Sequence, residues 1–552
     1  MKIVIIGGVA AGTSAAAKIR RTDEDAAITI YEKDRHVSYG TCGLPYYVSG
    51  RIENINSLVL NNPKSFSQRF NIGVRKRCEV LGIDIMSKTI KVKDLKNGEV
   101  FSDNWDKLLI ATGSKPIELE MEGTDSENVF TLKTIDDGLR LKRCLDKLGG
   151  DGLQAVIIGG GFIGLELLEA FKKKGLKVTI LEKTRHLLPM FDWQIIGFLH
   201  DYLKREGIDI ITEEIATGLI KNKDKAAYVQ TGAGDRIKAD IVFFGIGTRP
   251  ESRLASDAGI AVDGNGAICV DKFLQTDVAD IYSAGDCCQA KNEVSGESRP
   301  YYLASIANRQ GRTAGYNMAG GRDVFCASTV TSIIKVLDLT LAKTGISLKE
   351  AERAGIDAGI IEAHLPSHVG YYPGAQTIHM MLLYNKENGS ILGFQAIGKK
   401  GVSKRADIIS TAIRAGMKAW DLAGLDLGYQ PEFGSAKDVV NILGMIAENV
   451  KKREVSFIET EELESMIREK RDFMLLDVRT EKEYRSGSIE GSVNIHIDDL
   501  RKNLHKLEKD KAVIVYCKTG YRSYLAYRIL ANSGFKKLRV LNGSITSWSR
   551  KI

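Results

Sequence analysis

The sequence is constrained most by a strand, glycine turn and helix pattern that occurs twice, about 150 residues apart. In the first copy the apolar run Ile3–Ile6 leads into Gly7–Gly12, and a segment with helical spacing follows. In the second copy Ala155–Ile158 leads into Gly159–Gly164 and another helical segment. Glycines at such a turn let the backbone approach a pyrophosphate, which then faces the helix N-terminal amides. The pattern predicts an α/β chain with two dinucleotide-binding domains.

Each copy also ends its second strand in an acidic residue. Glu32 lies twenty residues past Gly12, and Glu182 lies eighteen residues past Gly164. An acid at this place takes a ribose hydroxyl. Val9 replaces the middle glycine of G-x-G-x-x-G in the first copy, so that copy alone is an incomplete match. The two copies together are far more specific, and they predict a flavin and a nicotinamide with hydride passing between them.

The nicotinamide site favours NADH but leaves NADPH open. Glu182 hydrogen-bonds a 2′-hydroxyl and repels a 2′-phosphate. Lys183 and Arg185, just beyond it, are able to accommodate that phosphate.

Three short motifs fit the plan of two cofactors. Leu108–Gly113 is predicted to close the first domain, and Phe243–Pro250 is predicted to close the second. Ile281–Asp286 ends a strand in an acid, where a carboxylate is well placed to meet a flavin ribityl hydroxyl. Any one of them is also compatible with a plain strand and turn.

The segment Ser38–Tyr47 holds one cysteine, Cys42. A reductase of the dithiol type carries a second cysteine five positions later, where this chain has Tyr47. A lone cysteine is by default a buried structural residue. Gly, Pro and Tyr neighbours argue against a regular core element here, so we expect Cys42 to be the redox thiol.

Composition excludes several other classes of protein. The 552 residues carry a net charge of +8 with no long basic run, so a phosphate-rich small molecule suits the chain as well as nucleic acid, which we do not expect. The eight cysteines are scattered, none in a C-x-x-C pair, which predicts neither a disulfide framework nor a metal site and fits a reducing cytosol. Met1 is followed at once by a strand-like run, and no apolar run reaches spanning length. We therefore expect a cytoplasmic protein with no signal peptide and no membrane segment.

A second α/β pattern occupies the end of the chain. Phe473–Arg479 is a predicted buried strand that ends in Asp-x-Arg, and Val513–Tyr516 runs into the loop Cys517–Arg522 and a helix. Backbone N–H groups at a helix N-terminus lower a thiol pKa and stabilise an anionic persulfide. Arg522 adds a fixed positive charge, so Cys517 is predicted to carry sulfane sulfur.

In this order the motifs resemble the pyridine nucleotide–disulfide oxidoreductase superfamily over about residues 1–445. The single cysteine in Ser38–Tyr47 resembles the coenzyme A-disulfide reductase branch, and the last domain resembles a rhodanese domain. NADH oxidase and peroxidase relatives also use one cysteine, but they place a histidine in the first glycine segment, and Gly7–Gly12 has none. The whole chain therefore resembles a coenzyme A-disulfide reductase–rhodanese fusion, a family associated with persulfides and polysulfides.

The resemblance implies two Rossmann-like domains, an α+β dimerisation domain, a C-terminal α/β rhodanese domain and a homodimer. The expected boundaries are 1–112 with 250–320 for FAD, 113–249 for NAD(P)H, 321–445 for dimerisation, 446–454 for a linker and 455–552 for the rhodanese domain. Strands are expected at 332–336, 358–363, 377–384 and 391–396, and a helix at 406–415.

The resemblance also implies the site residues. Cys42 and Cys517 are the expected catalytic thiols, with Arg522 beside the second. Two tyrosines of the partner subunit are expected near the redox cysteine; Tyr372 and Tyr429 are preferred, with Tyr371 as a rival. The residues expected at the cofactors are Gly7, Gly8, Ala10, Ala11, Gly12, Glu32, Lys33, Ala111, Thr112, Gly113, Gly159, Gly161, Ile163, Gly164, Glu166, Glu182, Gly247, Gly285, Asp286 and Ala304.

Coenzyme A is expected as a substrate moiety. Lys18 and Arg21 are candidates for its phosphates, although an exposed helix face explains them almost as well. Ser38 and Thr41 are expected nearer the thiol end. Glu166 is either a solvated helix residue or, as in related flavoproteins, part of the nicotinamide pocket.

These assignments predict an enzyme in which NAD(P)H reduces FAD, and FAD reduces a mixed disulfide or persulfide on Cys42. Its substrates would be persulfides, polysulfides or coenzyme A disulfides, and Cys517 would handle sulfane sulfur. One alternative is a coenzyme A-disulfide reductase with an auxiliary sulfurtransferase. Another is a redox or sulfur sensor with little turnover, against which the intact second nucleotide motif speaks.

Overall fold

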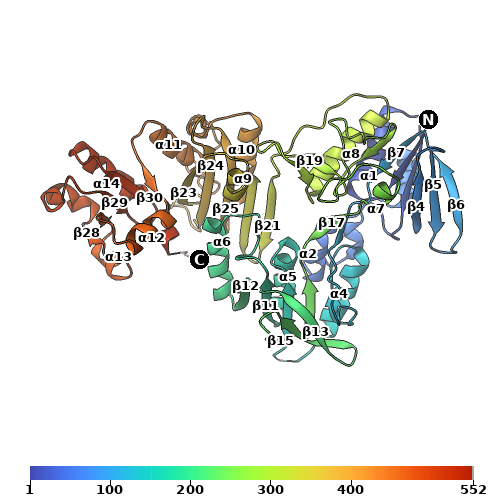
Figure 1. Cartoon of the computed structure of the whole chain (residues 1–552), viewed down its shortest axis with the longest axis horizontal. Helices are drawn as coiled ribbons and strands as arrows, with labels where there is room; N and C mark the ends of the chain where they lie inside the picture. Colours follow the sequence, from blue (N-terminus) through green and yellow to red (C-terminus); the bar gives the residue numbers. More distant parts are fainter. Residues whose placement is uncertain (151, 550–552) are drawn as a thin grey trace. The chain divides into compact units, whose positions relative to one another are not determined.

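The structure, a computed structural model, describes residues 1–150 and 152–549 (Figure 1). Its contacts divide the chain into two compact units, one of residues 1–189 with 203–330 and one of residues 190–202 with everything from Thr331 onward. Residues 550–552 of the predicted rhodanese domain lie outside the described part. Within the described part, no helix has both the length and the apolar character needed to cross a membrane.

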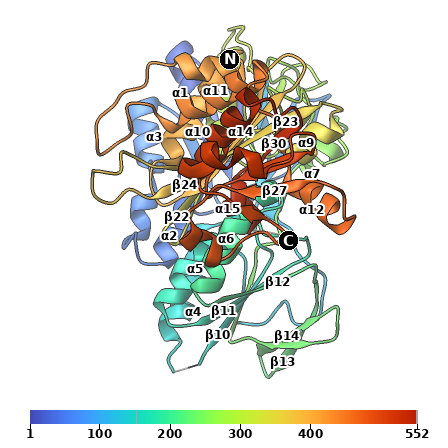
Figure 2. The ribbon, with the colours of Figure 1, turned by 90° about the vertical axis from the view of Figure 1, so that its left-hand side faces the viewer.

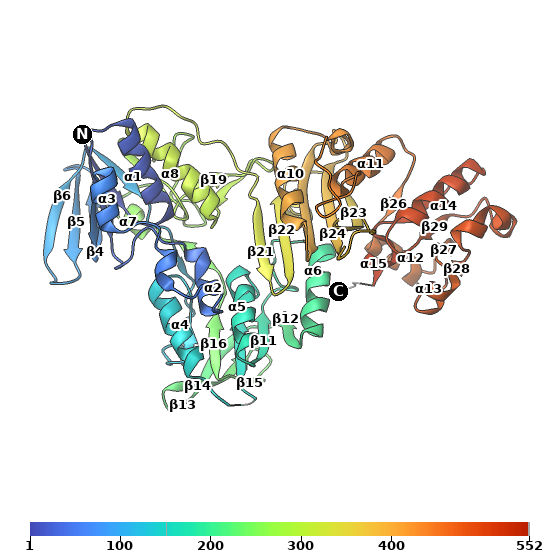
Figure 3. The same ribbon diagram turned by 180° about the vertical axis from the view of Figure 1, so that it is seen from behind.

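The first unit begins with a parallel sheet in the order β18-β7-β1-β2-β3. Its strands are β1 (Lys2–Ile6), β2 (Ala27–Glu32), β3 (Gly73–Lys76), β7 (Lys107–Ile110) and β18 (Ile281–Ser283). Two helices, α1 (Ala10–Thr22) and α8 (Ala304–Met318), cover one face, and Figure 3 shows them side by side. The antiparallel strands β4 (Cys78–Asp84), β5 (Thr89–Asp94) and β6 (Val100–Asn104) cover the other face. Both faces are therefore buried, as the unbroken apolar strands predict.

The second sheet of this unit repeats the plan in the order β12-β11-β10-β16-β9. Its strands are β9 (Val129–Phe130), β10 (Gln154–Ile158), β11 (Lys177–Glu182), β12 (Ile208–Thr212) and β16 (Ile241–Phe244). Helix α5 (Phe162–Lys173) packs on β10 and β11. A ribbon of β13 (Ala216–Asn222), β14 (Lys225–Thr231) and β15 (Arg236–Lys238) packs on the opposite face.

A short antiparallel pair, β8 (Ser114–Pro116) with β17 (Thr248–Pro250), lies where the chain leaves the first sheet and where it returns. After β17 the chain returns to pair β18 with β7. The first sheet is thus assembled from two separate stretches of sequence.

The second unit begins with an antiparallel sheet in the order β21-β22-β25-β24-β23. Its strands are β21 (Ser332–Val336), β22 (Leu339–Gly345), β23 (Ala358–Pro366), β24 (Thr377–Asn385) and β25 (Ile391–Gly398). Helix α10 (Val402–Arg414) packs on β22 and β25. Helix α6 (Trp193–Arg205) contributes Phe198, whose ring stacks on His379 of β24 with 3.7 Å between centroids. The four expected strands are present, and β22 is an additional one.

Helix α11 (Val439–Lys451) follows this sheet and packs on β23. Asp438 caps it by accepting the Val440 N–H. The predicted linker 446–454 therefore starts inside a helix and is irregular only after Lys451.

The last domain is a parallel sheet in the order β26-β30-β29-β27-β28, seen in Figure 2. Its strands are β26 (Phe457–Ile458), β27 (Met474–Asp477), β28 (Val493–Asn494), β29 (Val513–Tyr516) and β30 (Leu538–Leu541). One core forms with α14 (Tyr521–Asn532), and the core on the other face forms with α12 (Thr460–Arg468) and α15 (Ser544–Trp548).

The remaining helices and strands complete the description. They are η1 (Thr41–Gly43), α2 (Leu44–Val48), η2 (Ile55–Leu58), α3 (Pro63–Phe70), α4 (Ile135–Lys147), α7 (Arg253–Asp257), β19 (Gln289–Lys291), β20 (Ser298–Pro300), α9 (Leu348–Arg353), η3 (Ala419–Gly424), α13 (Glu481–Arg485) and η4 (Ile497–Lys506).

The first glycine turn sets how closely α1 approaches β1, and this makes Gly12 a test of the fold. A Cβ at Gly12 would overlap the carbonyl oxygen of Gly7, and backbone has little room to move. We expect Gly12→Ala to lower the free energy of unfolding by about 1–3 kcal/mol, as overpacking usually does. Gly82→Ala is the control, because nothing lies within 4 Å of its added Cβ. Equal unfolding midpoints for the two variants in urea would contradict this account.

Candidate active site

The first glycine turn presents free backbone amides to a ligand. Helix α1 begins after Val9 with no side-chain cap and no acidic residue in its first turn. By contrast, Thr134 caps α4 in a capping box with Asp137. The N-terminal N–H groups of α1, including those of Ala10, Ala11 and Gly12, are thus left for another acceptor. A dinucleotide pyrophosphate has the charge and the acceptors that this turn lacks.

Glu32 closes this turn from the end of β2. Its Oε2 accepts the Gly8 N–H at 2.7 Å, and its Oε1 accepts the Asp34 N–H at 2.9 Å. Burial raises the pKa of Glu32. The carboxylate therefore lies in the glycine turn, as the ribose-binding role requires, and the exposed Lys33 follows it.

The second turn has the same construction. Helix α5 begins after Gly161 without a side-chain cap or a first-turn acid, and Ile163 and Gly164 lie in its first turn. Glu182 Oε2 accepts the Gly160 N–H at 2.7 Å. A Cβ at Gly159 would lie 2.6 Å from the oxygen of Gly245. Both predicted nucleotide cradles are thus present and fit their groups.

Ala111 and Gly285 contact the first cradle, and the other residues predicted at the flavin lie on neighbouring segments. Ala111, Thr112 and Gly113 follow β7, Gly247 precedes β17, and Gly285 with Asp286 follows β18. Asp286 Oδ2 accepts the Ser114 hydroxyl at 2.8 Å, and Lys133 Nζ donates to the same hydroxyl at 2.8 Å. Ala304 begins α8, another helix without a side-chain cap.

Three of these supporting residues were not predicted. Ser114 and Lys133 hold the Asp286 carboxylate, and the fully buried Gln310 accepts the Gly285 N–H at 2.9 Å. Ser114 directly follows the predicted motif Leu108–Gly113 and was within reach of sequence reasoning. Lys133 and Gln310 lie in segments without a motif, and only the fold reveals them.

Cys42 lies in η1, immediately before α2. It is an exposed free thiol. Its packed surroundings, Glu166 and Asp286 raise the pKa of the Cys42 thiol, whereas the Thr41 hydroxyl and Lys133 oppose that rise. Residues of both predicted cofactor sites thus act on this thiol, as its proposed place between a flavin and a substrate requires.

Glu166 lies in the second turn of α5, near Cys42 and Tyr46. Burial raises its pKa to about 7, and the Tyr46 hydroxyl lies 3.4 Å from its carboxylate. It is therefore not a solvated helix residue, and its surroundings support the pocket role.

Cys287 and Cys288 are rival thiols near the same strand ends. Both are almost fully buried, with 0% and 1% of their surface exposed, and burial raises both pKa values. A thiol that is neither exposed nor readily ionised is a poor nucleophile, so the structure favours Cys42.

The predicted coenzyme A contacts lie on and near α1. Lys18 Nζ lies 4.5 Å from the centre of the Tyr316 ring on α8, and Arg21 is exposed at the end of α1. Ser38 is 6% exposed and has a positive φ of 51°. Thr41 begins η1 beside Cys42. The structure brings Thr41 to the thiol but leaves the phosphate contacts as predictions.

In the second unit, the contacts of Tyr371, Tyr372 and Tyr429 show which two of the three lie together. The hydroxyls of Tyr371 and Tyr429 are 2.7 Å apart, and both side chains are exposed, by 75% and 45%. Tyr372 instead packs edge-on against His368, with 5.6 Å between ring centres. The geometry favours the rival Tyr371 over Tyr372 as the companion of Tyr429.

A buried ion pair fixes the two loops that carry these tyrosines. Arg405 is 1% exposed and donates from Nη2 to Asp438 Oδ2 at 2.8 Å. The same Nη2 donates to the carbonyls of Ser367 at 3.0 Å and Phe433 at 3.4 Å. One guanidinium thus joins the loop before Tyr371 to the loop after Tyr429.

The last domain places Cys517 at the end of β29, inside a nest of donors. The Gly520 N–H lies 3.1 Å from its Sγ, and the Ser523 hydroxyl lies at 3.6 Å. Helix α14 starts directly after Gly520, whose φ is 112° and which provides no side-chain cap. The helix N-terminus therefore faces the sulfur, as the sequence predicts for a persulfide loop.

Arg522 is in place but is already paired. Its two terminal nitrogens donate to the Glu483 carboxylate at 2.7 and 2.8 Å. This pair lowers the pKa of Glu483 to about 2. The positive charge near Cys517 is thus partly neutralised, a feature that the sequence motif alone does not show.

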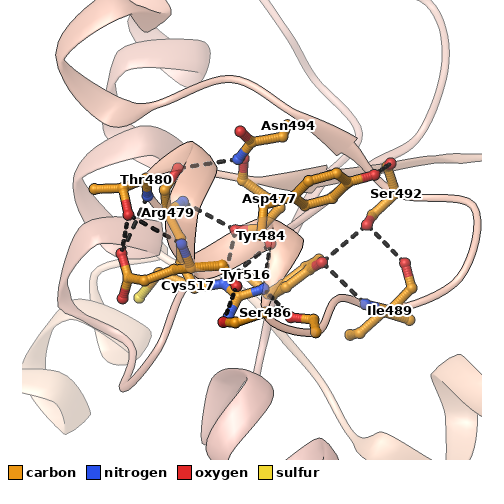
Figure 4. A network of polar contacts seen from close by, with 12 residues as sticks. Asp477, Arg479, Thr480, Tyr484, Ser486, Ile489, Ser492, Asn494, Tyr516 and Cys517 are labelled. Atoms are coloured by element: carbon orange, nitrogen blue, oxygen red, sulfur yellow. Dashed lines mark hydrogen bonds and ion pairs between the residues drawn. The ribbon is translucent and has the colours of Figure 1, made fainter.

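Figure 4 shows the polar network around β27 and β29 that supports the loop. Arg479 donates to the buried Asp477 at 2.6 Å, which explains the Asp-x-Arg pattern. The hydroxyls of Tyr516 and Ser492 lie 2.9 Å apart. These contacts fix the strand end from which Cys517 emerges.

Comparison with known proteins gives three family matches and close structural relatives. Residues 1–311 match the pyridine nucleotide-disulphide oxidoreductase family, residues 331–439 match its dimerisation domain, and residues 459–551 match the rhodanese-like domain. The crystal structure of reduced Bacillus anthracis CoADR-RHD has a TM-score of 0.96 at 34% identity, covering 100% of this chain and 98% of that one. A NAD-dependent persulfide reductase from A. fulgidus has a TM-score of 0.92 at 35% identity, covering 99% and 100%.

A curated relative, the coenzyme A disulfide reductase of Staphylococcus haemolyticus, is 30% identical over 81% of this chain and 100% of its own length. These matches confirm the predicted fold class and the predicted resemblance. The first family match alone covers more than half of the 552 residues. The chain belongs to the pyridine nucleotide-disulphide oxidoreductase family of FAD- and NAD(P)H-dependent enzymes, and it carries both the dimerisation domain of that family and a rhodanese-like domain.

Proposed function

We propose that the chain is a flavoprotein that uses NAD(P)H to reduce persulfides, polysulfides and disulfides of coenzyme A through the single thiol of Cys42. The observation that carries the proposal is the exposed Cys42, which lies near residues of both predicted cofactor sites, Glu166 and Asp286. Relatives named for coenzyme A disulfide reduction and for persulfide reduction support it.

The reaction at Cys42 follows from thiol exchange. The thiolate sulfur bonds to the carbon-linked sulfur of a persulfide, R–S–SH, the S–S bond breaks, and hydrosulfide leaves. The product on the enzyme is a mixed disulfide between Cys42 and R. When bound, FAD supplies the two electrons taken from NAD(P)H. With one proton they return the Cys42 thiolate and free RSH.

The thiolate must form before attack. Some groups around Cys42 lower the pKa of its thiol and others raise it. Lys133 and the Thr41 hydroxyl favour the thiolate, while Glu166 and desolvation by the surrounding protein favour the thiol. Hydroxyl donors that approach the sulfur would shift this balance. The exposed pair Tyr371 and Tyr429, reaching the partner subunit's site in a homodimer, is our candidate for those donors.

Cys517 has the complementary role of accepting or delivering sulfane sulfur. Its N–H and hydroxyl donors suit an anionic persulfide. Because Glu483 already pairs with Arg522, we expect the loop to prefer singly charged or neutral sulfur donors over a dianion such as thiosulfate.

The assembly and placement of the chain complete the proposal. We propose a cytoplasmic homodimer with the domain limits given by the sequence, and with Lys18, Arg21 and Ser38 at coenzyme A. The rival activity, a coenzyme A-disulfide reductase with an auxiliary sulfurtransferase, differs in which acceptor turns over faster. Rates with coenzyme A persulfide, coenzyme A disulfide and polysulfide, measured side by side, distinguish the two.

Cys42→Ser should abolish turnover while leaving the delivery of electrons to the flavin. We expect persulfide and disulfide reduction to fall about a thousandfold or more, because the nucleophile is gone. NADH should still bleach the flavin absorbance in a stopped-flow instrument. Cys326→Ser is the matched control, since Cys326 is the other exposed free cysteine. Persulfide reduction retained in Cys42→Ser would assign the electron exit to another thiol.

Cys517→Ser should remove the sulfurtransferase activity and leave the reductase activity intact. We expect complete loss of sulfurtransfer to cyanide, because Cys517 is the thiol to which the donors of this loop point. Reduction of free coenzyme A disulfide should continue at the wild-type rate. If that reduction stopped as well, Cys517 would belong to the electron path, and the division of labour would be wrong.

Tyr371→Phe should affect turnover more than Tyr372→Phe. Removal of a hydroxyl that stabilises a charged sulfur costs about tenfold to a hundredfold in kcat, whereas Tyr372 packs against His368 and its ring remains in the variant. Tyr429→Phe should resemble Tyr371→Phe because the two hydroxyls are paired. A larger loss in Tyr372→Phe would restore the sequence-based choice.

A further inference from the structure

The rhodanese domain packs on the edge strand of the dimerisation sheet through buried polar groups. β23 contributes Glu362 and His364, and the segment after β30 contributes Asn542, Gly543 and Ser547; we call these five residues the polar joint. Only 8%, 4%, 1% and 8% of Glu362, His364, Asn542 and Ser547 is exposed. Figure 1 shows β30 beside β23.

Asn542 extends the hydrogen bonding of the edge strand. Its Oδ1 accepts the Glu362 N–H at 3.0 Å, and its Nδ2 donates to the Ile360 carbonyl at 3.1 Å. The same Nδ2 donates to the Glu459 carboxylate at 3.1 Å. An edge strand has unpaired backbone groups, and here one side chain of the neighbouring domain satisfies two of them. This contact is specific in register, unlike a loose tether.

The donors in the joint can be assigned from the chemistry of their partners. The Gly543 carbonyl only accepts, so His364 Nε2, 3.1 Å away, carries a proton. The same nitrogen lies 3.0 Å from the Ser547 hydroxyl, which in turn donates to Glu362. With a neutral His364, the proton between its Nδ1 and that of His379, 3.0 Å apart, belongs to His379. Donation then runs in one direction, from His379 to Glu362.

The N-terminal residues of α15 contact the persulfide loop. The Ser544 hydroxyl accepts the Cys517 N–H at 3.3 Å and lies 3.8 Å from its sulfur. The N–H groups of Ile545 and Thr546 donate to the carbonyls of Cys517 and Lys518 at 3.2 and 3.3 Å. Helix α15 has only five residues. A shift at Ser547 therefore moves the Cys517 loop as well.

We propose that Glu362 and Ser547 are positioning residues for Cys517: the dimerisation sheet holds α15, and α15 holds the persulfide loop. The rhodanese domain thus has one fixed place on the dimerisation domain, and its sulfur chemistry depends on that place. The inference goes beyond the proposed function, because it does not involve the reduction chemistry of Cys42.

The joint should weaken as pH rises. Burial raises the pKa of Glu362 to about 8, and that of Glu459 to about 7. An unfolded glutamate ionises near its ordinary value of 4.5, so the folded joint binds more protons between that pH and 8, and its stability falls across this window. The titratable groups that act on Glu362 are Glu459 and Glu461, and His364 is linked to it through the Ser547 hydroxyl, with His379 behind His364.

The test uses the full-length dimer with Glu362→Ala, Glu362→Gln and Ser547→Ala. Glu387→Gln is the matched control, since Glu387 is exposed in a turn of the same sheet. Two readouts report on the loop itself: the pH profile of Cys517 alkylation by iodoacetamide, resolved by peptide mass spectrometry, and hydrogen-exchange protection of Ile545 and Thr546. Reduction of coenzyme A disulfide shows whether the rest of the enzyme is intact.

We expect Glu362→Ala and Ser547→Ala to change the Cys517 alkylation rate and the two protection factors by about tenfold, as the loss of a buried hydrogen bond allows. In Glu362→Gln the amides of Ile545 and Thr546 should stay protected, and their protection should fall less between about pH 5 and 8 than in the wild type. A second variant, Glu459→Gln, should remove the remaining pH dependence of that protection. Wild-type values in both Glu362→Ala and Ser547→Ala would overturn the proposal. So would an equal loss of disulfide reduction in every variant except the control, because that result indicates general unfolding.

If an alanine variant does not fold, Gly543→Ala provides the same test from the rhodanese side. Its Cβ would overlap Ser547 and come within 2.8 Å of Glu362 Oε2. Altered Cys517 alkylation with normal disulfide reduction supports the proposal, and unaltered alkylation overturns it.

Discussion

The close approach of α1 to its neighbours is the constraint on which the first unit depends. On one side Gly12 meets the backbone of the turn after β1, and on the other Gly311 and Gly315 of α8 meet the backbone oxygens of Ala11 and Ala15. Added Cβ atoms at these glycines would overlap those oxygens. The contact fixes α8 against α1, so the two uncapped helix N-termini are held in one arrangement. The amides that would face a pyrophosphate and a flavin are therefore positioned by backbone packing, before any ligand binds.

In the second unit a buried ion pair, Arg405 with Asp438, fixes the positions of neighbouring segments, as the close glycine contacts do in the first unit. Arg405 and Asp438 are almost fully buried, and a buried pair is costly unless further hydrogen bonds satisfy it. Here the Arg405 guanidinium also donates to backbone carbonyls of two loops, so the ion pair holds those loops together. Tyr371 and Tyr429 on the same loops are exposed, and their hydroxyls are paired with each other. Rigid support beneath exposed side chains is what a site completed by another subunit needs.

Sequence reasoning succeeded where the pattern is local and failed where partners are distant. The repeated turn and its acid predicted β1 and β2 almost to the residue. Strand β22 was missed because Lys343 lies buried within it, and its partner Glu350 comes only later in the chain. Adjacent tyrosines cannot be told apart by pattern, and only the fold shows that the hydroxyls of Tyr371 and Tyr429 are paired. Which tyrosines enter the partner's site stays a prediction. The contact between Glu362 and Ser547 joins residues far apart in sequence and leaves no local signal.

Helix α11, which leads from the dimerisation sheet towards the last domain, limits where this chain can vary in length. Helix α11 runs to Lys451, and the rhodanese core begins at Val455. Each residue inserted into a helix rotates the next domain by about 100° and advances it by about 1.5 Å. Such a rotation would carry Asn542 away from the edge of β23, where its amide fits one register. Insertions and deletions within α11 should therefore be rare among relatives that keep the polar joint, whereas the irregular residues 452–454 can absorb them.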